Sequence, residues 1–178
     1  MYRVNFFLIL AVSCLLSGCG YHLTSEAQTP SLTAGKTIAI PMWRSKSYRP
    51  NLEAILTGSL VDEFALRSGG MVVAEEDAAE LLLTGTIVTY ATIPVAFTSA
   101  DQVRVYRATM TVDATLAEKR SQKVLWKGTL SASQDYQAYI DLSQQNRIAL
   151  QQDSEVAALR EISRKIAQQL FQRMSDNF

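Results

Sequence analysis

The feature that most constrains the fold is an alternation of apolar and polar side chains over residues 103–118. The apolar members are Tyr106, Ala108, Met110, Val112, Ala114 and Leu116, and the polar members between them are Arg107, Thr109, Thr111, Asp113 and Thr115. Because successive side chains of a strand point to opposite faces of a sheet, the pattern predicts a long strand with one buried and one polar face. The sheet is therefore expected to be covered on one side only.

Two further long strands are predicted beside this one. Residues 80–93 place Leu81, Leu83 and Ile87 on one face, and residues 124–132 alternate in the same way after a turn at 119–122, which makes a hairpin. A β-branched run at 37–41, ended by a proline, predicts a shorter first strand. We expect loops at 43–49, 94–105 and 134–150, the last a long ordered loop that can contain some helical turns.

Two helices are predicted from apolar residues that recur at steps of three and four. The first begins at Pro50-Asn51, carries Leu52, Ile55, Leu56, Leu60 and Phe64, and is stopped by Ser68-Gly69-Gly70. The second is capped by Asp153 or Ser154 and carries Val156, Leu159, Ile162, Ile166, Leu170 and Met174. The order β-α-β-β-β-α predicts a single α+β domain over residues 36–178, a mixed four-stranded sheet with both helices packed on one face.

The N-terminal residues are expected to lie outside this domain. Arg3 precedes an apolar run from Val4 to Leu16, which is too short to span a bilayer comfortably. A basic residue followed by a short apolar run predicts a signal peptide over residues 1–18. The run closes with Leu16-Ser17-Gly18-Cys19, which resembles the lipobox of bacterial lipoproteins, so Cys19 is expected to carry covalent lipid, palmitate included. Residues 19–35 would then form a tether. An ordinary secretory peptide remains the alternative, because Ser17 and Cys19 would permit its cleavage.

Composition narrows the class of protein. With Cys14 removed and Cys19 acylated, no thiol remains for a disulfide, a metal site or a nucleophile. Loss of Arg3 leaves 16 basic (17 minus 1) against 17 acidic side chains, so no overall field favours nucleic acid. The lone histidine, His22, lies in the tether, and no catalytic or phosphate-cradling motif is present. We expect a non-enzyme that uses no cofactor and no metal.

Basic residues at one end of the predicted sheet are candidates for binding a phosphorylated amphiphile. Antiparallel topology brings the 94–105 loop and the exit of the 124–132 strand to the same end, so Arg104 and Arg147 can approach each other, with Arg107 just below. Phe97, Tyr136 and Tyr139 would add amphipathic surface. Solvated arginines and loop-anchoring tyrosines are the alternative. A weaker phosphate candidate, Lys119 with Arg120 and Lys123, lies at the opposite end. The threonine-rich face is equally consistent with solvation and with packing inside another protein.

Three segments resemble the LptE family of lipopolysaccharide-assembly lipoproteins. They are Cys19-Gly20-Tyr21-His22-Leu23 followed by Pro30, the segment Ile38 to Phe64, and Tyr106 to Leu116 with its threonine alternation. The resemblance implies a lipid-anchored protein on the periplasmic face of the outer membrane. It would plug the lumen of the barrel LptD in a one-to-one complex, help that barrel fold and contact lipopolysaccharide. Gly20, rather than aspartate, after Cys19 agrees with outer-membrane sorting by resemblance to the enteric rule. In that family, basic residues that contact lipopolysaccharide lie in the loop between the second and third strands and in the loop before the last helix. The nearest basic residues here are Arg104 and Arg147, although neither lies in a matching local motif.

Two other functions are considered. A lipoprotein activator of a peptidoglycan synthase would also show a lipobox, a tether and a small domain. Its enzyme would lie across the periplasm, whereas about 17 tether residues reach at most roughly 60 Å. A periplasmic hydrolase would need a catalytic group with an orienting neighbour, and the only histidine, His22, lies in the tether.

Overall fold

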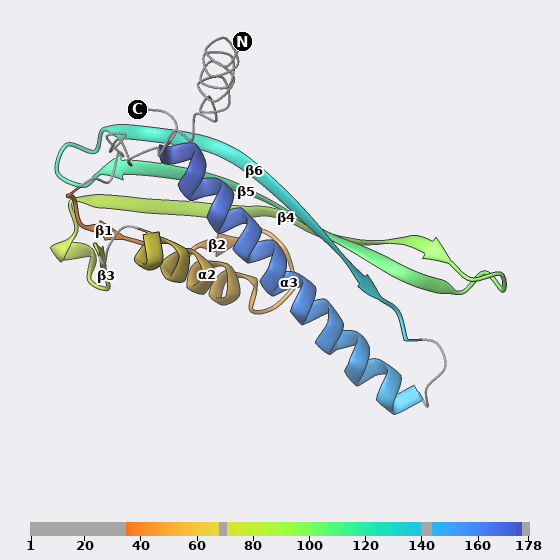
Figure 1. Ribbon diagram of the computed structural model, residues 1–178. Helices are drawn as coiled ribbons and strands as arrows, with labels where there is room; N and C mark the ends of the chain where they lie inside the picture. Colours follow the sequence, from red (N-terminus) through yellow and green to blue (C-terminus); the bar gives the residue numbers. More distant parts are fainter. Residues whose placement is uncertain (1–34, 68–70, 140–143, 176–178) are drawn as a thin grey trace, which may run out of the picture.

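The computed structural model describes residues 35–67, 71–139 and 144–175. Its elements, drawn in Figure 1, are β1 (Ile38–Ala39), β2 (Arg44–Ser45), α2 (Leu52–Arg67), β3 (Val72–Val73), a 3₁₀ turn at Glu76–Ala78, β4 (Leu81–Phe97), β5 (Val103–Glu118), β6 (Val124–Gln137) and α3 (Gln144–Ser175). The signal peptide, Cys19, His22 and all but the last residue of the tether lie outside the described residues.

The sheet is mixed, as predicted, but has six strands rather than four. Its order is β3-β1-β4-β5-β6, and β2 also pairs with β4. The pairs β4–β5 and β5–β6 are antiparallel, whereas β1, β2 and β3 make parallel pairs. The strand number was wrong because β2 and β3 contain only two residues each, too few to show a period.

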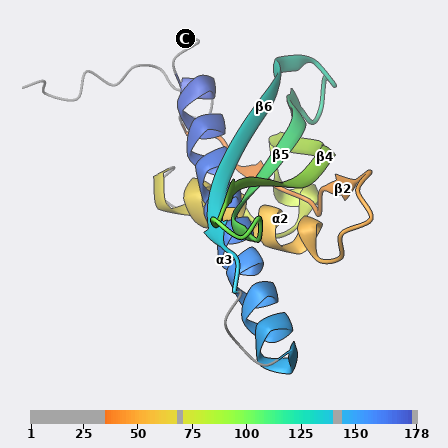
Figure 2. The ribbon, with the colours of Figure 1, turned by 90° about the vertical axis from the view of Figure 1, so that its right-hand side faces the viewer.

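A single hydrophobic core lies between the sheet and the two helices. From the sheet it takes residues of one face only, including Leu83 of β4, Met110 of β5 and Leu130 of β6. From the helices it takes the predicted stripes of α2 and α3, which also contact each other through Phe64 and Phe171, whose rings lie edge to face with centroids 5.2 Å apart. Both helices therefore cover the same face, and Figure 2 shows the sheet from its end.

The predicted 43–49 loop is interrupted by β2 and begins at a buried residue, Trp43. The Trp43 side chain is 2 % exposed. Trp43 lies in the short stretch between β1 and β2 that does not itself pair with β4, although both strands do. The backbone N–H of Trp43 donates to Thr57 Oγ1 (3.1 Å), and the indole N–H donates to the carbonyl of Leu83 (3.4 Å). Gly85 provides the space for the ring, because a Cβ there would lie 2.5 Å from Trp43 Cζ3. The tryptophan thus replaces part of the edge pairing of β4.

The two loops predicted at the far end of the sheet are shorter than expected. β4 continues to Phe97 and β5 begins at Val103, while β6 continues to Gln137 and α3 begins at Gln144. Residues 146–150 in the first turns of α3 are exposed, and the apolar period is weak there, although glutamine, arginine, alanine and leucine favour helix. We call this end the distal end: residues 93–105, the last residues of β6 and the first turns of α3 (Figure 1). The proximal end carries the β5–β6 turn and the last turns of α3.

Candidate functional site

A cavity of about 400 Å³ lies at the distal end, where the start of α3 passes the ends of β5 and β6. Its walls are formed by Val103, Tyr106, Ala138, Tyr139, Arg147, Ile148, Gln151 and Gln152. Two hydrogen bonds donated by backbone N–H groups hold the wall together. The N–H of Ala138 donates to the carbonyl of Arg104 (2.9 Å), and the N–H of Tyr139 donates to Gln151 Oε1 (3.3 Å). The walls are mostly apolar and aromatic, with one guanidinium, which suits an amphiphile.

The aromatic residues of this end play different parts. Tyr106 lines the cavity and stacks on Tyr136, with ring centroids 5.6 Å apart and an interplanar angle of 23°. Tyr136 is buried, and its burial raises the pKa of its phenol. Of the three aromatics predicted as surface, Tyr139 lines the cavity and Phe97 is 55 % exposed, whereas Tyr136 belongs to the core.

Two of the predicted arginines lie at the cavity or beside it. Arg147 is part of the wall, and Arg104 follows Val103, another wall residue, on β5. Both are exposed, and within residues 35–67, 71–139 and 144–175 neither forms an ion pair. Their charges are therefore available to an anionic group.

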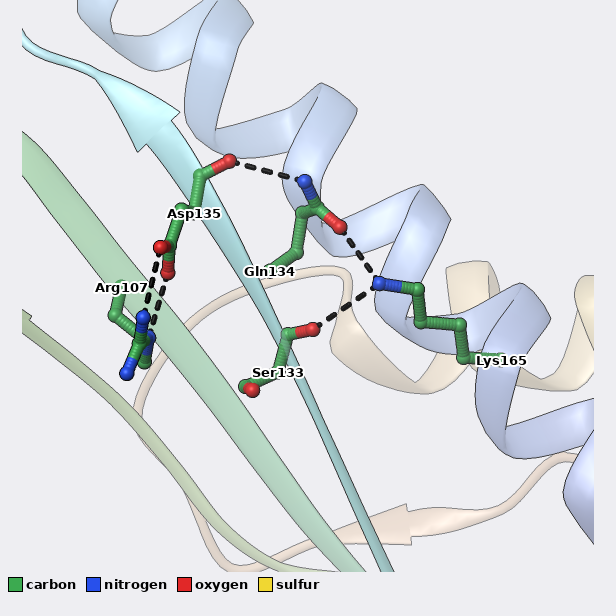
Figure 3. A network of polar contacts seen from close by, with 5 residues as sticks. All are labelled: Arg107, Ser133, Gln134, Asp135 and Lys165. Carbon is green, nitrogen blue, oxygen red and sulfur yellow. Dashed lines mark hydrogen bonds and ion pairs between the residues drawn. The ribbon is translucent and has the colours of Figure 1, made fainter.

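Arg107 has a different environment. By strand alternation it belongs to the threonine-rich face, opposite to Tyr106. Its Nε donates to Asp135 Oδ1 (2.6 Å) and its Nη2 to Asp135 Oδ2 (2.8 Å), as Figure 3 shows. This bidentate pair lowers the pKa of Asp135 and raises the pKa of Arg107. An incoming phosphate would have to compete with that carboxylate.

The same part of β6 is bound to α3 on its other side (Figure 3). Lys165 Nζ donates to Gln134 Oε1 (2.7 Å) and to the carbonyl of Ser133 (3.3 Å), and Gln134 Nε2 donates to the carbonyl of Asp135 (3.1 Å). These contacts hold the distal part of β6 against the helix.

Sequence reasoning missed part of the site. Ile148, Gln151 and Gln152 fell in or next to the predicted 134–150 loop, and Tyr106 was predicted only as a core residue. Large apolar side chains are also exposed around the distal end: Ile93, Val95, Phe97, Ile148 and Leu150. An extension of the helical period upstream from Val156 would have suggested that Ile148 belongs to α3.

The basic cluster at the proximal end has a structural role in part. Lys119 Nζ donates to Asp77 Oδ1 (2.8 Å) and to the carbonyl of Glu76 (2.6 Å), and this contact lowers the pKa of Asp77. Arg120 and Lys123 are exposed.

In the described part of the chain, no group of histidine, cysteine, aspartate and glutamate side chains could hold a metal ion. Neither described α-helix combines the length and apolarity needed to cross a bilayer.

Several solved structures, two of them of lipoproteins, share this fold at low sequence identity. Rare lipoprotein B from Shewanella oneidensis is 14 % identical with a TM-score of 0.50, covering 78 % of this chain and 95 % of its own. Lipoprotein B from Nitrosomonas europaea is 11 % identical with a TM-score of 0.53, covering 80 % and 84 %. The hypothetical protein CT253 from Chlamydia trachomatis is 10 % identical with a TM-score of 0.52, covering 79 % and 98 %. A comparison with curated protein sequences gives no match.

The fold and the distal site define a class: a small α+β domain with one helix-covered and one open sheet face, similar to these bacterial lipoproteins. The family itself is identified by its sequence model, which is described as lipopolysaccharide-assembly and matches residues 35–174. The chain belongs to the LptE family, which confirms the resemblance found in the sequence.

Proposed function

We propose that this chain is an outer-membrane lipoprotein, anchored through lipid on Cys19, that plugs the LptD barrel and assists its assembly. The family match carries the proposal. The open face supports it, because hydroxyl side chains from three adjacent strands lie along it: Thr84, Thr86, Thr109, Thr111, Thr115, Thr129, Ser131 and Ser133. A polar sheet face is suited to the polar lumen of an outer-membrane barrel. The role is structural and does not involve catalysis.

The test is copurification from solubilised outer membranes with the full-length lipidated chain. A barrel several times the mass of this chain should be recovered at about one copy per copy. Recovery of a peptidoglycan synthase in place of the barrel would contradict the proposal. Mass spectrometry of the same sample tests the anchor, because Cys19 should be the first residue and should carry acyl chains.

We further propose that the distal end contacts lipopolysaccharide during its delivery to the cell surface. Arg147 and Arg104 would bind phosphate groups, and the cavity and the exposed apolar residues around it would contact the apolar part of the ligand. Arg107 would contribute only after leaving Asp135, so it is the least available of the three candidates.

Single charge reversals test this site. Arg147→Glu and Arg104→Glu should each weaken lipopolysaccharide binding by about tenfold, because each replaces a cation beside the ligand with an anion. Arg160→Glu on the exposed side of α3 makes the same charge change away from the cavity and should bind like the wild type. Barrel copurification should be unchanged in all three. Equal binding by all three variants would remove the distal site while leaving the barrel proposal standing.

A further inference from the structure

The segment from Met42 to Tyr48 exposes every second side chain along one edge of the sheet. Met42 is 64 % exposed and Tyr48 is fully exposed, while Arg44 and Lys46 between them are also exposed. The residues at the intervening positions, Trp43, Ser45 and Ser47, are buried or half-buried. We call Met42, Arg44, Lys46 and Tyr48 the edge row.

The edge row is held in place by its own backbone and by neighbouring elements. The N–H of Lys46 donates to the carbonyl of Ile87 on β4 (2.9 Å). Further along, the N–H of Ser47 donates to Ser45 Oγ (3.0 Å) and the N–H of Arg49 donates to Ser47 Oγ (3.4 Å). Arg49 Nε also lies 3.2 Å from Glu155 Oε1 on α3. An ordered segment loses little backbone entropy when a partner covers it.

The charge of the edge row is positive and unpaired. Within the described residues neither Arg44 nor Lys46 forms an ion pair, and the row contains no acidic side chain. A hollow of about 620 Å³ adjoins the row on the open face, and Met42 and Arg44 line it together with Thr84, Thr86 and Thr115. The hollow also contains Glu76 and Asp113, and Asp113 accepts a hydrogen bond from Thr129 Oγ1 (2.6 Å).

The composition of the row is that of a protein contact. Tyrosine, methionine and arginine are enriched in protein interfaces, and tyrosine and arginine are also enriched among energetic hot spots. The two cations favour a partner that carries acidic groups. The row continues into the open face, which the proposed function already assigns to the barrel.

We propose that the edge row is an anchor for an acidic segment of the barrel wall, with Tyr48 packed against that wall and Arg44 and Lys46 paired with its carboxylates. This inference rests on the proposed barrel partner. It adds that the edge row is the surface that determines the affinity of this chain for the barrel.

Copurification of the barrel with full-length lipidated variants tests the inference. Tyr48→Ala and the double variant Arg44→Glu/Lys46→Glu should each lower the barrel recovered per copy of lipoprotein by about tenfold or more. The matched control is Arg120→Glu/Lys123→Glu at the β5–β6 turn, which makes the same change in net charge on exposed residues and should keep wild-type recovery. Thermal unfolding and lipopolysaccharide binding should stay at wild-type values, because the edge row is exposed and away from the distal cavity.

Different failures have different meanings. If the wild type recovers the barrel and the edge-row variants recover it within about twofold, the anchor is wrong and the proposed function stands. If the wild type recovers no barrel, both are wrong. Crosslinking of the edge row to anionic phospholipid in vesicles provides the third arm, because the acyl chains on Cys19 would hold every variant on the vesicle. Loss of these crosslinks in the variants, with barrel recovery intact, would assign the row to the membrane surface and overturn the inference.

Discussion

At the scale of single residues, the contact between Gly85 and Trp43 links the edge of the sheet to the core. The indole lies where a side chain at position 85 would be, and it also takes the carbonyl of Leu83 as a hydrogen-bond acceptor. A glycine is therefore needed at this point of β4 for packing, not for an unusual backbone angle.

Gly85→Ala should lower the free energy of unfolding by about 1–3 kcal/mol, because the new Cβ would overlap a ring that is itself fully packed. Urea unfolding followed by circular dichroism measures the change. Gly58→Ala provides the control in α2, where a Cβ meets nothing within 4 Å, and it should stabilise by up to about 1 kcal/mol through helix propensity. Equal effects of the two substitutions would contradict the role given to Trp43.

Tyr90 is the second residue whose environment predicts a measurable effect. Its hydroxyl donates to Glu155 Oε1 (3.1 Å), and burial, followed by the charge of Glu155, raises the pKa of Tyr90 from 10.0 to about 12. The protonated phenol therefore stabilises the fold fully below about pH 10, and this stabilisation is lost as the pH rises from about 10 towards 12. The free energy of unfolding of Tyr90→Phe should fall less steeply over that interval than that of the wild type. Parallel curves for the two proteins would show that Tyr90 titrates normally.

At the scale of elements, α3 protects the outer edge of β6. The carbonyl of Ser133 accepts from Lys165, and Arg173 Nη1 lies 3.5 Å from the carbonyl of Thr129. An unprotected edge strand offers its backbone to a strand of another molecule, and side chains from a covering helix are one means of preventing this.

Lys165→Ala combined with Gln134→Ala should expose the part of this edge around Ser133 and give a dimer whose fraction rises with concentration. Analytical ultracentrifugation measures the distribution, and faster hydrogen exchange of β6 amides should accompany it. Arg160→Ala, on the exposed side of the same helix, should leave the protein as monomeric as the wild type. A double variant that stays monomeric at all concentrations would show that Lys165 does not guard the edge.

The elements that the sequence could predict are those in which an apolar pattern repeats over many residues. The stripes of α2 and α3 and the alternation of β5 each repeat several times, so their faces and their partners followed from position alone. β2 and β3 depend on pairing with distant residues and have no period of their own. The start of α3 is determined by helix propensity without burial, which is why Arg147 was assigned to a loop. The pairing of Arg107 with Asp135 required the register of β5 on β6, which the chain order does not specify.

At the scale of the whole molecule, one core joins the described elements. Trp43 between β1 and β2 and Trp126 on β6 lie in different parts of the sheet, and both pack against this core. Single-tryptophan proteins made by Trp43→Phe or Trp126→Phe should therefore show fluorescence and far-ultraviolet transitions with the same urea midpoint within each variant. A fluorescence midpoint that precedes the circular-dichroism midpoint would indicate that one side of the sheet opens separately.

The length of β5 has a geometric consequence. Its 16 residues, at about 3.4 Å each, extend roughly 50 Å, whereas the apolar belt of an outer-membrane barrel is only about 25 Å tall. A domain seated lengthwise in such a barrel would protrude beyond at least one rim. The first described residues begin at the proximal end, so the proposed tether and the distal end with its arginines would then emerge at opposite heights of the wall (Figure 1).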